Sequence, residues 1–153
     1  MAQLAGEALD VLRACFVIAL VSDNPVQAGA ILDRLDSEGY QTLVWNWGSG
    51  LHMMAQRAQP ALIVLDCDKK RGKGLGLVLR RMQRDTSTNG IPILFCTGLP
   101  SLPAVPLREE CVIRKPYDLD HLCARVKAVI GEPPPLHRTY RRRSTAVAVA
   151  SNT

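Results

Sequence analysis

The sequence predicts an α/β fold built on a doubly wound parallel sheet. Short apolar runs such as Cys15–Val21 and Ala61–Leu65 have the length and branching of strands that are buried on both faces. Between such runs lie segments in which apolar residues recur at helical spacing, as in 74–84. Strands that alternate with helices imply parallel βαβ units, with helices covering both faces of the sheet.

The elements follow in a regular order. The first strand ends at Val21, before Ser22, and Asn24-Pro25 opens a helix that Gly39 ends. Within this helix, apolar Val26, Ala30, Ile31 and Leu35 recur at helical spacing. We expect further strands at 42–45, 61–65, 91–96 and 111–113, and further helices at 49–58, 74–84 and 119–130.

The domain organisation predicted for the 153 residues is one domain with a tail at each end. Residues 1–13 are expected to form an arm or a short helix, and 14–131 the domain. Residues 132–153, rich in Pro and Arg, are expected to form a disordered tail. Three prolines within 99–107 exclude a regular helix over that stretch, so the helix before the fifth strand should be short or missing.

Composition narrows the classes of function. Five cysteines without CxxC spacing indicate a reducing, cytoplasmic setting with neither a disulfide framework nor a zinc site. No apolar run approaches the roughly 20 residues of a membrane span. The net charge of +5 is concentrated in Arg138–Arg143, so nucleic-acid binding is not expected of the domain and could involve only that tail.

Polar residues follow the predicted strands where the strands end. Because the carboxyl ends of parallel strands meet at one edge of a sheet, these residues should converge there. They are Ser22 and Asp23, Asp66 and Asp68, Thr97, and Lys115. Clustered carboxylates suit Mg²⁺, a carboxylate can act as a nucleophile toward phosphorus, and an ammonium and a hydroxyl can bind phosphoryl oxygens.

In this arrangement, residues 14–131 resemble the response-regulator receiver (CheY-like) family. The family has an acidic pair after strand one, a phosphoacceptor Asp after strand three, Thr or Ser after strand four and Lys-Pro after strand five. The matching residues here are Ser22-Asp23, Asp66, Thr97 and Lys115-Pro116, and Gly74 matches a family glycine eight positions after the acceptor. The resemblance implies a flavodoxin-like sheet of five parallel strands in the order 2-1-3-4-5.

The resemblance also implies a role for each matching residue. Asp66 would accept the phosphoryl group, and Thr97 and Lys115 would bind it. Asp23, Asp66 and the backbone carbonyl of Asp68 would hold Mg²⁺.

Four departures from the family pattern affect this site and its output. Ser22 stands where the family has the first acid of the pair, and Lys69-Lys70 replaces the usual Met-Pro. Val112 stands three residues before the lysine, where the family carries a switch aromatic. The stretch from Thr97 to Lys115 is short and rich in proline, so the output face should differ from the usual one.

These features lead to one principal hypothesis and two alternatives. We expect a stand-alone receiver, since 132–153 is too short for an effector domain. It would be a phosphoacceptor signalling domain, not an enzyme. It would receive its phosphoryl group from a histidine kinase or phosphotransfer protein. Its output would run through a downstream protein, a homodimer or onward phosphoryl transfer. The first alternative is a non-phosphorylated pseudo-receiver that acts as a protein-binding module. The second is a small flavodoxin-like enzyme or nucleotide binder, although Ser22-Asp23-Asn24-Pro25 is no glycine-rich phosphate loop.

Overall fold

A computed structural model describes residues 16–46, 50–67, 72–98 and 111–133. They contain five parallel strands: β1 (Val17–Ser22), β2 (Gln41–Asn46), β3 (Leu62–Cys67), β4 (Ile93–Thr97) and β5 (Val112–Arg114). The sheet order β2-β1-β3-β4-β5 confirms the predicted order 2-1-3-4-5.

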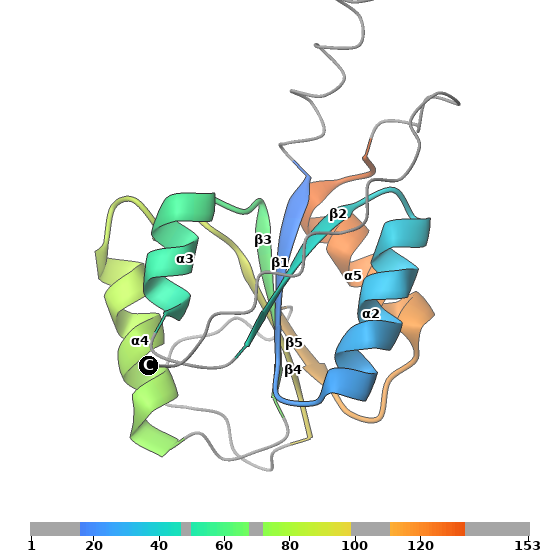
Figure 1. Cartoon of the computed structure of the whole chain (residues 1–153), viewed down its shortest axis with the longest axis horizontal. Helices are drawn as coiled ribbons and strands as arrows, with labels where there is room; N and C mark the ends of the chain where they lie inside the picture. The colour runs from blue at the N-terminus through green and yellow to red at the C-terminus, as the bar shows by residue number, and fades with distance from the viewer. Residues whose placement is uncertain (1–15, 47–49, 68–71, 99–110, 134–153) are drawn as a thin grey trace, which may run out of the picture.

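Four described helices cover the sheet on both faces: α2 (Pro25–Ser37), α3 (Leu51–Ala58), α4 (Gly72–Arg84) and α5 (Leu119–Ile130). Figure 1 shows α2 and α5 on one face, with α3 and α4 on the other. The core is divided in the same way, because alternate strand residues face opposite sides. Ile18 and Leu20 pack under α2 and α5, whereas Ala19 and Val21 pack under α3 and α4.

Helix α2 begins with a cap that the sequence encodes. The Asn24 side chain accepts hydrogen bonds from the backbone N–H groups of Val26 and Gln27, at 3.1 and 3.2 Å, and Pro25 occupies the first turn. These contacts satisfy two of the N–H groups that a helix start leaves without intrahelical partners. The first turn of α2 is thereby fixed beside the end of β1.

The apolar residues that recur at helical spacing in α2 are not all buried. Ile31 and Leu35 are fully buried, but Val26 is 84% exposed and Ala30 is also exposed. Ala28 is buried in their place, so the buried stripe is Ala28, Ile31 and Leu35. A stripe at i, i+3 and i+7 is also helical, and only the direction from which the sheet approaches selects between the two.

Each of the five strands extends past its predicted carboxyl end, and the extensions of β1, β3 and β4 include site residues. Strand β3 ends at Cys67, so Asp66 lies within the strand and not after it. Strand β4 likewise includes Thr97 as its last residue. Polar side chains end an apolar run in the sequence, but hydrogen bonding to the neighbouring strand continues past them.

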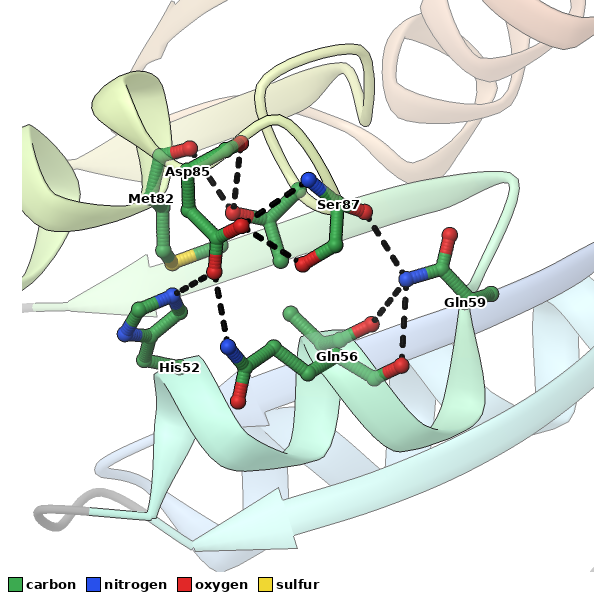
Figure 2. Close-up of polar contacts among 8 residues, drawn as sticks. His52, Gln56, Gln59, Met82, Asp85 and Ser87 are labelled. Carbon is green, nitrogen blue, oxygen red and sulfur yellow. Dashed lines mark hydrogen bonds and ion pairs between the residues drawn. The ribbon is translucent and has the colours of Figure 1, made fainter.

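A polar network joins α3 to the turn after α4 (Figure 2). One Asp85 carboxylate oxygen lies 2.7 Å from His52 Nε2 and accepts from Gln56 Nε2 at 2.7 Å. The other accepts from the backbone N–H and the hydroxyl of Ser87. Asp85 lies directly after the end of α4 and therefore ties that end of α4 to α3.

Several predictions fall on residues outside the described part of the chain. These are the arm at 1–13, nearly all of the tail at 132–153 and the short or missing helix between β4 and β5. They stay predictions. No helix in the described ranges has the length and apolar character that crossing a membrane requires.

Candidate functional site

The candidate site is built on the carboxyl ends of β1 and β3. Ser22 and Asp66 are direct partners in the register of these two strands. One residue further on, the backbone N–H of Asp23 donates to the backbone carbonyl of Asp66 at 3.3 Å. The parallel pairing thus brings Ser22 and Asp23 beside Asp66, although Ser22 and Asp66 are 44 residues apart in sequence.

Asp66 is fully buried and has a partner for each carboxylate oxygen. Its Oδ1 lies 2.5 Å from Lys115 Nζ, in an ion pair whose lysine side chain is only 12% exposed. Its Oδ2 accepts a hydrogen bond from the Ser22 hydroxyl at 2.8 Å. A carboxylate that is buried away from solvent needs such partners, because an uncompensated buried charge costs several kcal/mol, roughly 3 or more.

Lys115 reaches the site from the turn after β5. Its backbone N–H donates to the carbonyl of Thr97 at 2.9 Å, which continues the β4–β5 pairing by one residue. A cis peptide bond joins it to Pro116. This backbone attachment to β4 holds the lysine stem at the end of the sheet where Asp66 lies.

Ser22 takes part in the site although it is not an acid. Its hydroxyl has one proton to donate, and Asp66 Oδ2 is its closer acceptor, since the carbonyl of Asn24 lies at 3.1 Å. The Ser22 hydroxyl oxygen also accepts a hydrogen bond from the backbone N–H of Asn24 at 3.1 Å. A hydroxyl therefore stabilises the Asp66 carboxylate where a second carboxylate would repel it.

Of the two remaining predicted site residues, the structure describes Thr97 but not Asp68. Thr97 is fully buried at the end of β4, where its register partner is Cys67, one position beyond Asp66. Asp68 lies outside the described residues, and its role as a metal ligand through its backbone stays a prediction. The described residues contain no group of three or more His, Cys, Asp or Glu arranged to hold a metal ion.

Two residues that sequence reasoning missed contact Lys115 or its neighbours. Gln27 Oε1, in the first turn of α2, accepts from Lys115 Nζ at 3.0 Å. Gln27 Nε2 donates to the Tyr117 hydroxyl at 3.5 Å. Tyr117 in turn makes a side-chain hydrogen bond with Cys96. The only signal in the sequence was position: Gln27 follows the Asn24 cap by three residues, and Tyr117 follows Lys115 by two.

Burial sets the protonation of the groups beside the ion pair. It raises the pKa of the Cys96 thiol to about 12, and the negative charge of Asp66 adds to this effect. Burial is also the largest cause of a raised pKa at Tyr117, followed by the charges of Cys96 and Asp66. Both groups are therefore neutral near pH 7, and each keeps a proton that it can donate.

Comparison with known proteins identifies the fold. No family profile and no curated protein matches the chain significantly, whereas many solved structures do. The receiver domain of a signal transduction histidine kinase from Syntrophus aciditrophicus is 25% identical with a TM-score of 0.62, over 86% of this chain and 98% of that one.

Two further structures agree with this match. The receiver domain of a sensor histidine kinase from Pseudomonas aeruginosa, with magnesium coordinated in its active-site cleft, is 24% identical with a TM-score of 0.56 (76% and 98% coverage). A response regulator from Desulfuromonas acetoxidans is 21% identical with a TM-score of 0.53 (74% and 95% coverage). This chain therefore has the CheY-like receiver fold.

Proposed function

We propose that this chain is a cytoplasmic receiver of two-component signalling. It accepts a phosphoryl group on Asp66, with Mg²⁺, from a histidine kinase or phosphotransfer protein, and it signals by binding another protein. The observation that carries the proposal is the fully buried Asp66 carboxylate held between Lys115 Nζ at 2.5 Å and the Ser22 hydroxyl at 2.8 Å. The free thiols of Cys67, Cys96, Cys111 and Cys123 support a reducing compartment.

The residues at this rim suit phosphoryl transfer to a carboxylate. An Asp66 oxygen attacks the phosphorus while the bond between the phosphorus and the donor's imidazole nitrogen breaks. That nitrogen then takes up a proton. The Lys115 ammonium then neutralises charge on the phosphoryl oxygens, and the Thr97 hydroxyl donates to one of them. Because Lys115 already contacts Asp66, this positive charge is in place before the donor arrives.

The donors present fit a magnesium ion. Two carboxylates, Asp23 and Asp66, come from neighbouring strand ends, and Mg²⁺ commonly binds through one or two carboxylates while keeping several waters. We propose the backbone carbonyl of Asp68 as a further ligand. Bound there, Mg²⁺ would neutralise charge on the transferred phosphoryl group.

The test is phosphorylation by acetyl phosphate in the presence of Mg²⁺, followed by intact mass. Wild-type protein should gain the mass of one phosphoryl group, and Asp66→Asn should gain none, since an amide is no nucleophile for this reaction. The matched control is Asp33→Asn, which removes an exposed carboxylate on α2 and should behave as wild type. Equal labelling of Asp66→Asn and wild type would place the phosphoryl group elsewhere and contradict the proposal.

One observation favours a second candidate, a pseudo-receiver that binds proteins without phosphorylation. Both oxygens of Asp66 already have partners within the chain, and Ser22 supplies a hydroxyl where an acid would attract the metal. Titration with Mg²⁺ distinguishes a phosphorylated receiver from a pseudo-receiver. A receiver should show saturable shifts in the amide resonances of Asp23 and Asp66, whereas a pseudo-receiver should show none.

A further inference from the structure

The Lys115 ammonium is shared between two acceptors on different elements. It lies 2.5 Å from Asp66 Oδ1 on β3 and donates to Gln27 Oε1 on α2 at 3.0 Å. An ammonium has three N–H groups, so it can serve both acceptors together. Both contacts therefore help to hold the ammonium in place.

The donor and acceptor chemistry of the neighbours fixes the direction of the contacts. Lys115 can only donate, so Gln27 must turn its oxygen toward the lysine and its NH₂ group toward Tyr117. The Tyr117 oxygen then accepts at 3.5 Å, and its own proton is left for the Cys96 sulfur. Raised pKa values keep both Tyr117 and Cys96 neutral, as this order of donors requires.

This chain of contacts ends at the protein surface. Tyr117 lines a pocket of about 440 Å³ between β5 and the start of α5, together with Arg114, Asp118, His121 and Arg125. The pocket is polar, and its lining includes two arginines and a histidine. The Tyr117 hydroxyl is therefore connected to Lys115 through Gln27. The same residue also lines a recess that a partner can reach.

We propose that Gln27 is a positioning residue that holds Lys115 at Asp66 and couples the phosphoryl state of Asp66, through Tyr117, to the pocket between β5 and α5. This inference rests on the proposed function. Phosphorylation replaces one negative charge with a phosphoryl group of about −2, further from the strand. The Lys115 ammonium follows that charge and leaves Gln27, so the amide loses its partner and re-pairs, and Tyr117 changes position in the pocket.

The same coupling gives Tyr117 a role that Val112 cannot fill. Val112 has neither a ring nor a hydroxyl, and it lies on the other side of Lys115 in the sequence. Tyr117 is the aromatic residue whose hydroxyl is joined to the lysine through one intervening side chain. Signal output would therefore pass along the turn from β5 to α5 and reach Arg114, His121 and Arg125.

The experiment adds beryllofluoride with Mg²⁺, a mimic of the phosphoryl group, to the full chain. Fluorine NMR measures its binding at Asp66, and amide chemical shifts of Arg114, His121 and Arg125 measure the response of the pocket. In wild type, binding should shift these amides. In Tyr117→Phe, which removes one hydroxyl, affinity should stay within about twofold, because no contact to the ligand is lost, but the pocket response should fall by more than half.

Gln27→Leu should change both measurements. It removes an acceptor that Lys115 gives up when the ligand binds, so the free protein loses a contact that the bound protein does not have. Beryllofluoride should therefore bind about threefold to tenfold more tightly, the net value of a typical hydrogen bond. The pocket response should also be lost. The matched controls are Tyr40→Phe, which removes a hydroxyl bonded to the Gly131 carbonyl, and Gln83→Leu, at an exposed position of α4. Both should respond as wild type.

The possible outcomes separate the two proposals. A bound fluorine signal with wild-type pocket shifts in Tyr117→Phe and Gln27→Leu would overturn the coupling and leave the proposed function standing. Absence of a bound signal in wild type would overturn both. A variant that fails to fold would be recognised by its amide spectrum before ligand is added, and the milder Tyr117→Phe then decides the question.

Discussion

At Asp66, the cost of burying a carboxylate is offset by two contacts of different kinds. Lys115 supplies opposite charge at 2.5 Å, and Ser22 supplies a neutral hydrogen bond at 2.8 Å. Since the Asp66 side chain is fully buried, neither contact competes with bulk water, and both are stronger than surface equivalents. The same residues that stabilise the unmodified carboxylate are those proposed to receive the phosphoryl group.

Removal of the lysine charge tests this balance. Lys115→Met should lower the free energy of unfolding by about 3 kcal/mol, because Asp66 stays buried without its ammonium partner. Urea unfolding at neutral pH measures the loss. The double variant Asp66→Asn with Lys115→Met should recover most of it, since no buried charge is then left without compensation. Equal stability of Lys115→Met and wild type would contradict the account.

At the scale of elements, a side-chain cap specifies the start of helix α2, and a glycine follows its end. Asn24 caps its start, and Gly39, with φ +94°, turns the chain after its end. A Cβ atom at Gly39 would also lie 3.2 Å from Cγ of Pro133. The first turn carries Gln27 into the site, so the cap positions a residue that contacts Lys115.

Two glycine substitutions in this region should have opposite signs. Gly39→Ala should lower the free energy of unfolding by about 1 kcal/mol or more, because a positive φ strains any residue with a Cβ. Gly29→Ala, inside α2 with nothing within 4 Å of the added Cβ, should raise it by about 0.5–1 kcal/mol. Thermal unfolding of the two variants beside wild type measures both. A higher free energy of unfolding in Gly39→Ala than in wild type would contradict the expected strain at this positive φ.

The Asp85 network should make the packing of α3 on α4 sensitive to acid. Hydrogen bonds from Ser87, first from its hydroxyl and then from its N–H, hold the pKa of Asp85 well below its usual range, and Gln56 and His52 add to the effect. A group with a depressed native pKa stabilises the fold above its unfolded pKa, about 3.9, and loses that contribution as pH falls toward the native pKa.

Asp85→Asn should therefore be less stable than wild type at neutral pH, and the difference should narrow as the pH falls below about 4. Urea midpoints measured from about pH 6 to about pH 2.5 test this, with Asp33→Asn as the control for loss of an exposed carboxylate. A difference that stayed constant over the whole range would show that ionised Asp85 is not what stabilises the network.

At the scale of the whole molecule, one sheet joins two cores and carries the site at a single edge. The residues under α2 and α5 and those under α3 and α4 alternate along the same strands, as Ile18 and Ala19 do. Because all strands are parallel, their carboxyl ends lie together, and the site is assembled only when the sheet is complete. Ligand binding at this edge should thus report on the folded state as a whole.

A ligand that binds only the native state should stabilise the entire fold. With Mg²⁺ and beryllofluoride at about 100 times the apparent Kd, the free energy of unfolding should rise by about 2.7 kcal/mol. Asp66→Asn should show no such rise. Thermal unfolding of both proteins with and without the ligand measures the effect, and an equal rise in the variant would indicate binding at another place.

The sequence by itself determined the alternation of strands and helices and the set of residues at the carboxyl edge, since both follow from local periodicity and from parallel pairing. Ser22, Asp66 and Lys115 could be placed near one another for that reason. The tertiary structure decided which stripe of α2 is buried, namely Ala28 and not Val26. It also decided that Gln27 meets Lys115 across 88 positions of the chain. Such contacts depend on how a helix is rotated against the sheet, and no local pattern in the sequence encodes that angle.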